Sequence, residues 1–316
     1  MKPWENTPLE LPDGRLVCRP HRLVICGSCT VDYSFMDEAL QESDQEDLYS
    51  DDEALGEYDT EVLRKQLAAR IRTDTPPGVS DVLDTSDIPD TSDTYVLRRG
   101  VGRVLPTIFV PPSSEAPQTL FPAGIGREAI PNVIRFIHRN DPKTLLIYTD
   151  GACINNGQSD PQAGWAFSFR PHKSDAKGYA SGRLEHEGPF GDGHQQTSNR
   201  AELRAVIGAL RFRNWKAEGF ARLVLATDSE YVVKGATEWV DGWLARNWRT
   251  SARAPVKNRD LWETLLGEME RWDERGLRIH LWRIPREWNA DADRAAKEGA
   301  RMDDRATYRD IMGVYC

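Results

Sequence analysis

The chain has 316 residues, of which 39% are hydrophobic and 9% aromatic, enough for one sizeable core and for one or two domains. The mean hydropathy is −0.59 and no apolar run approaches the ~18 residues of a membrane span, so we expect no membrane protein. The N-terminus resembles neither a secretory signal nor a transit peptide. Five cysteines argue against a disulfide framework, so we expect a reducing intracellular compartment, nucleus or cytoplasm rather than mitochondrion.

Acidic and basic residues are divided unevenly along the chain. Residues 1–140 contain 24 Asp and Glu against 14 Lys and Arg, a net charge of −10. The remaining residues carry a net charge of about +1, so the overall charge of −9 belongs to the front of the chain. Whether the charge suits a nucleic-acid partner therefore has to be judged from residues 141–316 alone.

Residues 1–35 form a short, turn-rich segment with a cluster of cysteine and histidine. Its members are Cys18, His21, Cys26 and Cys29, four soft ligands within twelve residues, a composition suited to tetrahedral zinc. We expect a structural Zn²⁺ there and a surface for an unidentified protein partner, while an incidental cluster stays the alternative.

Residues 36–100 are expected to be a largely disordered acidic linker, because their composition provides too little apolar surface to offset chain entropy. Within the linker, residues 61–72 have the apolar spacing of one amphipathic helix. Residues 101–142 are bounded by prolines, and the strand-like stretch at 101–112 is expected to dock as an edge strand.

A single domain is predicted over residues 143–303, followed by a tail at 304–316. Continuous apolar runs and helical stripes alternate there in the manner of an α/β domain. We expect a mixed sheet of five strands with helices on both faces. The expected strands are 145–149, 164–170, 178–186, 223–227 and 277–283, and the expected helices are 200–216, 229–240, 259–275 and 290–302.

Four acidic residues occupy special places in this pattern. Asp150 and Asp228 are each expected to end a buried strand, and Glu202 and Asp293 to lie in the first turns of helices. Each also has a purely structural explanation. Asp150 suits a turn, Asp228 a helix cap, Glu202 a capping box with Asn199, and Asp293 a favourable position near a helix N-terminus.

Taken together, the four carboxylates favour a metal site. Carboxylates that converge on one sheet edge repel one another unless a hard dication neutralises them, and Mg²⁺ prefers carboxylates, water and phosphate oxygens. This combination suits two-metal hydrolysis of phosphodiesters.

The residues around the carboxylates form five motifs. They are Tyr148-Thr149-Asp150-Gly151-Ala152-Cys153, Thr197-Ser198-Asn199-Arg200-Ala201-Glu202-Leu203, Thr227-Asp228-Ser229-Glu230-Tyr231-Val232, Val256-Lys257-Asn258-Arg259-Asp260-Leu261-Trp262 and Asn289-Ala290-Asp291-Ala292-Asp293. In this order they resemble the cellular (type 1) ribonuclease H family, the RNA–DNA hybrid nucleases, over one whole domain.

The resemblance implies an endonuclease that hydrolyses the RNA strand of RNA–DNA hybrids and leaves 5′-phosphate and 3′-hydroxyl ends. Asp150, Glu202, Asp228 and Asp293 would be the catalytic residues and would hold two Mg²⁺ or Mn²⁺ ions. The protein would act as a monomer. The alternative is a hybrid-binding or regulatory protein whose nuclease-like domain cuts poorly.

The resemblance also implies a nucleic-acid surface, which includes a basic segment over residues 246–259 that would contact the DNA strand without reading sequence. The residues expected to contact nucleic acid are Asn156, Thr197, Asn199, Trp239, Trp243, Arg249, Lys257 and Asn258. Gln195 stands where some relatives add an arginine, which weakens the expected phosphate grip.

One departure from the family concerns turnover. Many members carry a mobile histidine between the last strand and the last helix, whereas residues 284–288 of this chain contain none. We expect catalysis to survive with slower product release. His280 falls inside the last predicted strand and is expected to be a packed core residue.

Overall fold

The structure, a computed structural model, describes residues 96–313 apart from positions 113, 127, 130, 131 and 173–176, with short pieces ahead of them. It divides into two units, Met1–Val96 and Leu97–Cys316. The described pieces of the first unit form two antiparallel strand pairs. They are β1 (Leu9–Glu10) with β2 (Leu16–Val17) and β3 (Ile25–Cys26) with β4 (Val31–Asp32).

The predicted zinc site cannot be placed in this unit. Cys18, His21 and Cys29 lie outside the described residues, and Cys26 is described only as backbone in β3. The helix expected over 61–72 also lies outside them, as does nearly all of the acidic linker. These expectations stay predictions.

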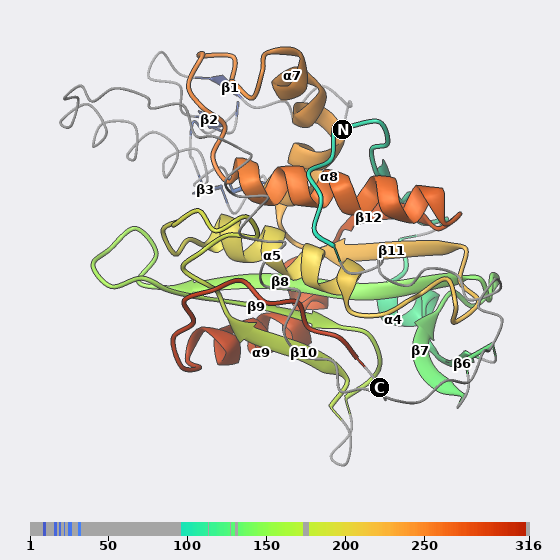
Figure 1. Cartoon of the computed structure of the whole chain (residues 1–316). Coiled ribbons are helices and arrows are strands. Elements are labelled where there is room, and N and C mark those ends of the chain that lie inside the picture. Colours follow the sequence, from blue (N-terminus) through green and yellow to red (C-terminus); the bar gives the residue numbers. More distant parts are fainter. Residues whose placement is uncertain are drawn as a thin grey trace, which may run out of the picture. The chain divides into compact units, whose positions relative to one another are not determined.

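A mixed sheet of eight strands organises the second unit (Figure 1). Its centre is parallel, because β11 (Arg222–Thr227) pairs with β8 (Thr144–Ile154) on one side and with β12 (Arg278–Arg283) on the other. β9 (Gln162–Ser168) and β10 (Tyr179–Arg183) continue from β8 in antiparallel order. These five strands are the mixed sheet that the sequence predicts.

The segment ahead of β8 adds three short strands. β5 (Thr107–Ile108), within the stretch expected to dock as an edge strand, pairs with β12 at the end of the sheet. β6 (Ala123–Gly126) and β7 (Val133–Ile137) form an antiparallel pair that joins β8 through β7. His280 of β12 is half-buried at the β5 edge, where its Nδ1 lies 2.7 Å from Thr107 Oγ1, rather than packed within the core.

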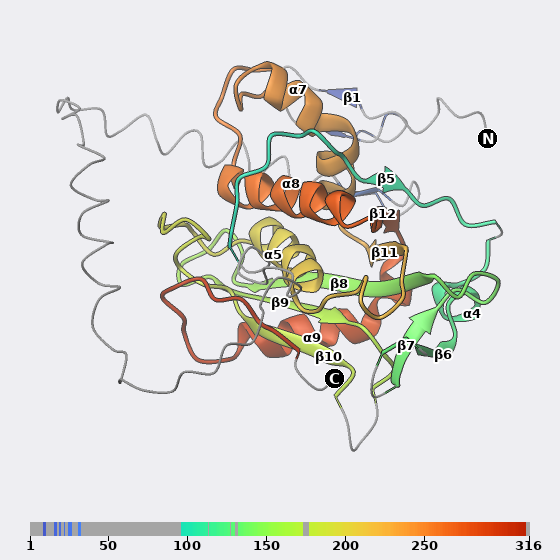
Figure 2. The same cartoon turned by 45° about the vertical axis from the view of Figure 1, so that its right-hand side comes forward.

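Helices cover both faces of the sheet (Figures 1 and 2). The helices of one face are α5 (Ser198–Arg211), α6 (Glu230–Lys234), α7 (Val240–Ala245) and α8 (Arg259–Glu274), with a π-helical turn at Gly235–Trp239 between α6 and α7. The opposite face carries α9 (Ala290–Ala300) and the short α4 (Pro117–Leu120). In the part of the chain that the structure describes, every helix is too short or too polar for a transmembrane segment.

Alternate residues of the central strands supply the two cores. Leu145 and Leu223 pack toward α5 and α8, whereas Leu146 and Val224 pack toward α4 and α9, and none of the four is exposed. Strands buried on both faces need apolar residues at every position. This is why β8 and β11 read as uninterrupted apolar runs.

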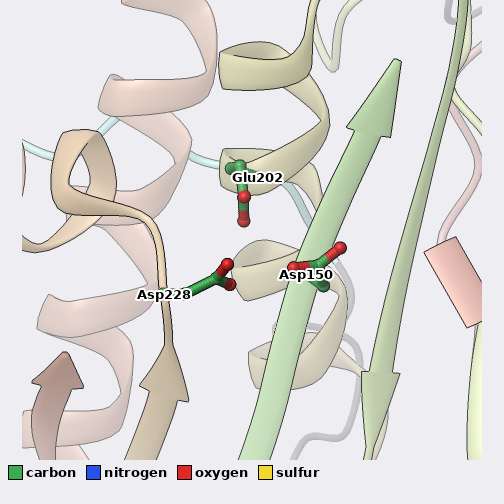
Figure 3. A group of neighbouring side chains, drawn as sticks. All are labelled: Asp150, Glu202 and Asp228. Carbon is green, nitrogen blue, oxygen red and sulfur yellow. The ribbon is translucent and has the colours of Figure 1, made fainter. Parts of the chain in front are cut away.

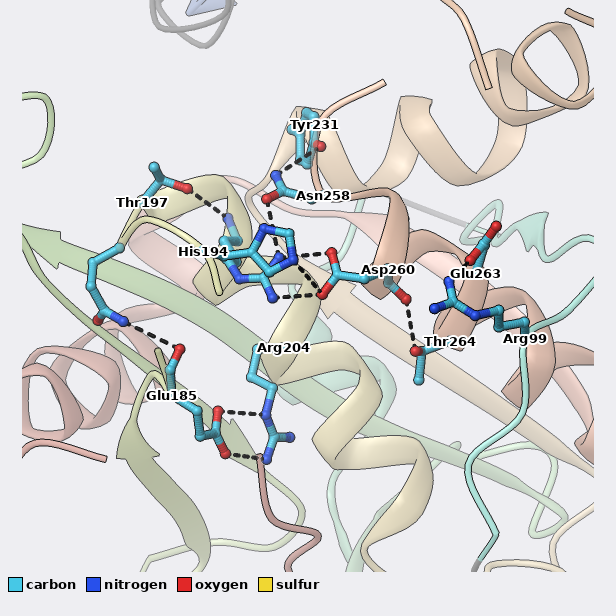
Figure 4. A network of polar contacts seen from close by, with 12 residues as sticks. Arg99, Glu185, His194, Thr197, Arg204, Tyr231, Asn258, Asp260, Glu263 and Thr264 are labelled. Carbon is cyan, nitrogen blue, oxygen red and sulfur yellow. Dashed lines mark hydrogen bonds and ion pairs between the residues drawn. The ribbon is translucent and has the colours of Figure 1, made fainter. Parts of the chain in front are cut away.

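Buried ion pairs fix α5 against its neighbours (Figure 4). The guanidinium of Arg200 donates to both carboxylate oxygens of Asp260, at 2.9 and 2.6 Å. Arg204 forms a second bidentate pair with Glu185, at 3.0 and 2.8 Å. Burial alone would raise the pKa of Asp260, but hydrogen bonds from Arg200 and His194 hold it well below the usual range of a carboxyl. Since these charges are buried and paired, they specify where α5 lies.

Gly151 allows α5 to lie directly on β8, and replacing it tests this contact. A Cβ at this position would lie 2.2 Å from the backbone nitrogen of Glu202. We expect Gly151→Ala to lower the free energy of unfolding by about 1–3 kcal/mol, because backbone has to move. Gly193→Ala, where a Cβ meets nothing within 4 Å, is the matched control. Equal melting temperatures for the two variants, measured by circular dichroism, would contradict the close contact.

Candidate active site

Three carboxylates meet at one end of the parallel strands (Figure 3). One oxygen of each of Asp150, Glu202 and Asp228 lies within 4.8 Å of the others. Asp228 directly follows β11, as predicted, but Asp150 lies within β8 rather than at its end. The reason is that β8 stops pairing with β11 at Tyr148 and continues along β9 to Ile154. Both aspartates therefore occupy the edge where β8 and β11 separate.

Glu202 reaches this edge from α5. The helix begins at Ser198, and its N-cap is Thr197, whose Oγ1 accepts a hydrogen bond from the backbone N–H of Arg200 at 3.2 Å. The capping box considered for Asn199 and Glu202 is therefore not formed, and the carboxylate of Glu202 points toward the two aspartates (Figure 3).

The three carboxylates are poorly solvated and repel one another. Asp150 is 1% exposed and Glu202 9%. Burial raises the pKa of Asp150 well above the ordinary value, and the neighbouring Asp228 raises it further. Burial has the same effect on the pKa of Glu202, with Asp150 and Asp228 adding to it. The site therefore favours either protons or a cation.

The donor set fits a hard dication. Asp150 Oδ2 and Glu202 Oε2 are buried, and neither has a hydrogen-bond partner within the described part of the chain. Buried polar atoms are normally paired, so these oxygens indicate a missing ligand. Carboxylate oxygens are the ligands that Mg²⁺ and Mn²⁺ prefer.

Asn289 organises two of the acids, a role that sequence analysis did not assign. Its side-chain amide donates to the backbone oxygen of Thr149 at 3.0 Å, to Asp150 Oδ1 at 3.1 Å and to Asp228 Oδ1 at 2.8 Å. The residue is 1% exposed. The amide thus links β8, the end of β11 and the start of α9. Its position in the closing motif was the available signal.

Asp293, the fourth predicted acid, lies in the first turn of α9 but outside the group of three. Its Oδ2 accepts a hydrogen bond from Lys297 Nζ at 2.7 Å, and its Oδ1 lies 3.4 Å from Arg286 Nη2. Arg286 Nε also lies 3.7 Å from Asp228 Oδ2. Asp293 therefore connects to the other acids through Arg286, a residue that the sequence did not single out.

Two of the predicted nucleic-acid contacts, Thr197 and Asn258, lie within the polar network of Figure 4. Asn258, with a φ of 55° at the start of α8, donates to Tyr231 OH at 3.3 Å, and its Oδ1 accepts from Arg200 at 3.4 Å. Thr197 caps α5 in the same region, and Asn156 Oδ1 accepts a hydrogen bond from the Ser198 backbone at 3.2 Å. Asn199 is half-buried in the first turn of α5.

The basic segment over residues 246–259 presents exposed cations above buried aromatics. Arg246, Arg249, Arg253, Lys257 and Arg259 are all exposed. Trp239, in contrast, is half-buried, and Trp243 is only 8% exposed. The Trp243 ring packs 5.3 Å from that of Trp262, so Trp243 belongs mainly to the core beneath the predicted nucleic-acid surface.

The fold and the site together define a class, a mixed α/β domain with a carboxylate site suited to a divalent metal ion at the edge of its sheet. The RNase H family profile matches residues 142–301, about half of the chain, and the chain belongs to the ribonuclease H family. The family resemblance read from the motifs is thereby confirmed.

Two relatives found by sequence agree with this assignment. Over 174 residues the chain is 36% identical to a ribonuclease H of Treponema pallidum, covering 53% of this chain and 97% of that relative. It is 39% identical over 153 residues to a ribonuclease H of Chromobacterium violaceum, covering 48% and 92% respectively. Among solved structures, that of LC9-RNase H1, a type 1 RNase H with the type 2 active-site motif, is 26% identical, with coverage of 50% and 72% and a TM-score of 0.36.

The raised pKa values predict how pH affects the metal-free protein. A carboxyl whose pKa is raised by folding contributes stability below its unfolded pKa and loses it as pH rises through the folded pKa. We therefore expect the melting temperature in EDTA to fall, as pH rises from the acidic range of an ordinary carboxyl toward neutrality, more steeply for the wild type than for Asp150→Asn. Mg²⁺ should restore it at the higher pH, and at lower pH, where the carboxyls still hold protons, Mg²⁺ binding should release them. Parallel pH profiles for the two proteins would refute the repulsion.

Proposed function

We propose that the chain is an endonuclease that hydrolyses the RNA strand of RNA–DNA hybrids with two Mg²⁺ or Mn²⁺ ions. The observation that carries the proposal is the meeting of Asp150, Glu202 and Asp228 within 4.8 Å in a chain of the ribonuclease H family. The unpartnered oxygens of two of these acids support a metal-bound state.

Asp150, Glu202, Asp228 and Asp293 would hold the ions in this proposal. When bound, such ions activate the attacking water and stabilise the leaving 3′ oxygen, which gives 5′-phosphate and 3′-hydroxyl products. The amide of Asn289 fixes one oxygen of Asp150 and one of Asp228, and so directs the carboxylates before any ion binds. This pre-orientation is the part of the chemistry that the protein itself supplies.

Substrate choice would follow from shape and from the sugar. An enzyme that cuts only the RNA strand has to contact 2′-hydroxyl groups, and polar side chains near the acids, such as Asn156 and Asn199, are suited to this. Thr197 and Asn258 would bind a phosphate of the DNA strand, with Arg249 and Lys257 of the basic segment farther along it.

Cleavage of a hybrid with Mg²⁺ is the test of the proposal. We expect the full chain to cut the RNA strand of a labelled hybrid and to leave duplex DNA intact. Asp228→Asn should lower kcat on the order of 10²-fold or more. The substitution removes a carboxylate that would hold the ions, and the ions would stabilise the charge that develops on the leaving oxygen. Binding of the hybrid without cleavage would favour the alternative, a regulatory protein with a poorly active domain.

The basic segment makes a separate prediction about affinity. Neutralising a phosphate contact reduces the slope of log affinity against log salt by about 1. We expect Arg249→Ala and Lys257→Ala each to weaken hybrid binding equally for unrelated hybrid sequences and to reduce this slope by about 1, as measured by fluorescence anisotropy. Arg278→Ala, at the exposed start of β12 and the opposite end of the sheet from Asp228, is the matched control. If neither Arg249→Ala nor Lys257→Ala changes the slope, the basic segment is not part of the binding surface.

A further inference from the structure

Arg286 is a cation placed against the candidate active site. It begins a 3-10 turn, Arg286–Trp288, between β12 and α9. Backbone hydrogen bonds from Trp288 to Pro285 and from Asn289 to Arg286, at 2.9 and 3.0 Å, fix this turn. The side chain is 72% exposed, yet its guanidinium lies between the carboxylates of Asp228 and Asp293.

The contacts of Arg286 are loose. Its Nε lies 3.7 Å from Asp228 Oδ2 and its Nη2 lies 3.4 Å from Asp293 Oδ1. Strong charge-assisted hydrogen bonds are about 2.7–2.9 Å long, and exposed ion pairs contribute little to stability. The backbone of the turn is therefore fixed, while the guanidinium is free to exchange partners at small cost.

Charge decides when that exchange happens. A guanidinium is always charged in proteins, so Arg286 is a permanent cation beside the carboxylates of Asp228 and Asp293. Dications bound to these carboxylates would neutralise the negative charge that Arg286 contacts in the free protein. The guanidinium then faces charges of its own sign and lacks an acceptor.

A nucleic-acid phosphate is the anion that would enter the same place, and the planar guanidinium fork matches its oxygens in pairs. We propose that Arg286 exchanges the carboxylates of Asp228 and Asp293 for a phosphate of the bound nucleic acid when metal and substrate occupy the site. This inference rests on the proposed function. It makes Arg286 a competitor of metal in the free protein and a substrate-binding residue in the complex.

The proposal predicts opposite effects of one substitution. Without nucleic acid, Arg286→Ala should tighten Mg²⁺ binding up to roughly five-fold, because a competing cation is removed. With a hybrid, the same substitution should lower kcat/KM by roughly 10- to 100-fold, the effect of losing a charged hydrogen bond. Arg286→Lys should keep the wild-type Mg²⁺ affinity and recover only part of kcat/KM, because an ammonium retains the charge without the fork.

The experiment titrates the full chain with MgCl₂ by calorimetry and then measures single-turnover hybrid cleavage at saturating Mg²⁺. Arg294→Ala is the matched control, because Arg294 is 58% exposed on α9 and pairs with Asp291 at 2.7 Å rather than with the candidate metal ligands. It should leave both measurements at wild-type values. Tighter Mg²⁺ binding together with slower cleavage, in Arg286→Ala alone, is the expected result.

Several outcomes would overturn the inference. Weaker Mg²⁺ binding in Arg286→Ala would mean that Arg286 supports the acids structurally. Unchanged Mg²⁺ binding would show that Arg286 does not compete with the metal. Unchanged cleavage would show that Arg286 does not contact a phosphate of the substrate. If the wild type leaves the hybrid intact, the proposed function fails. The phosphate contact is then read from hybrid affinity in Mg²⁺, which Arg286→Ala should weaken and Arg294→Ala should not.

Discussion

Repulsion among nearly buried carboxylates is the constraint on which the rest of the domain depends. Asp150 and Glu202 are almost inaccessible to water, and Asp228 lies beside both. Such an arrangement is unfavourable by itself, so the packing around it has to hold the acids together until a cation neutralises them. The amide of Asn289, donated to both aspartates, is the one neutral group shown to bridge them in the described part of the chain.

The position of Glu202 depends on how α5 is held. Three arginines along this helix form bidentate ion pairs, which are Arg200–Asp260, Arg204–Glu185 and Arg211–Asp310. Asp310 belongs to residues that follow the family match, which ends at 301. The backbone oxygen of Arg309 also accepts a hydrogen bond from Arg204 at 2.7 Å. The chain thus uses its C-terminal residues to fix the helix that carries an active-site acid.

Much of this could be predicted from the sequence, because burial leaves a strong pattern. The apolar runs of β8 and β11 predicted the centre of the sheet, and the motifs around Asp150, Glu202 and Asp228 predicted three acids of the site. The contacts of Asn289 and Arg286 could not be predicted, because they depend on how the turn before α9 is placed in space. Trp243 was assigned to the nucleic-acid surface but lies mainly in the core. The sequence could not separate the two roles, because an aromatic residue suits a core and a nucleic-acid surface equally well.

Diffraction from crystals soaked in MnCl₂ tests the central claim most directly, because Mn²⁺ is located by its anomalous scattering independently of any activity. The account predicts an anomalous peak within coordination distance of oxygens from Asp150, Glu202 and Asp228, and no such peak in crystals of Glu202→Gln. Crystals that bind Mn²⁺ only elsewhere, with the three carboxylates still together and empty, would contradict it.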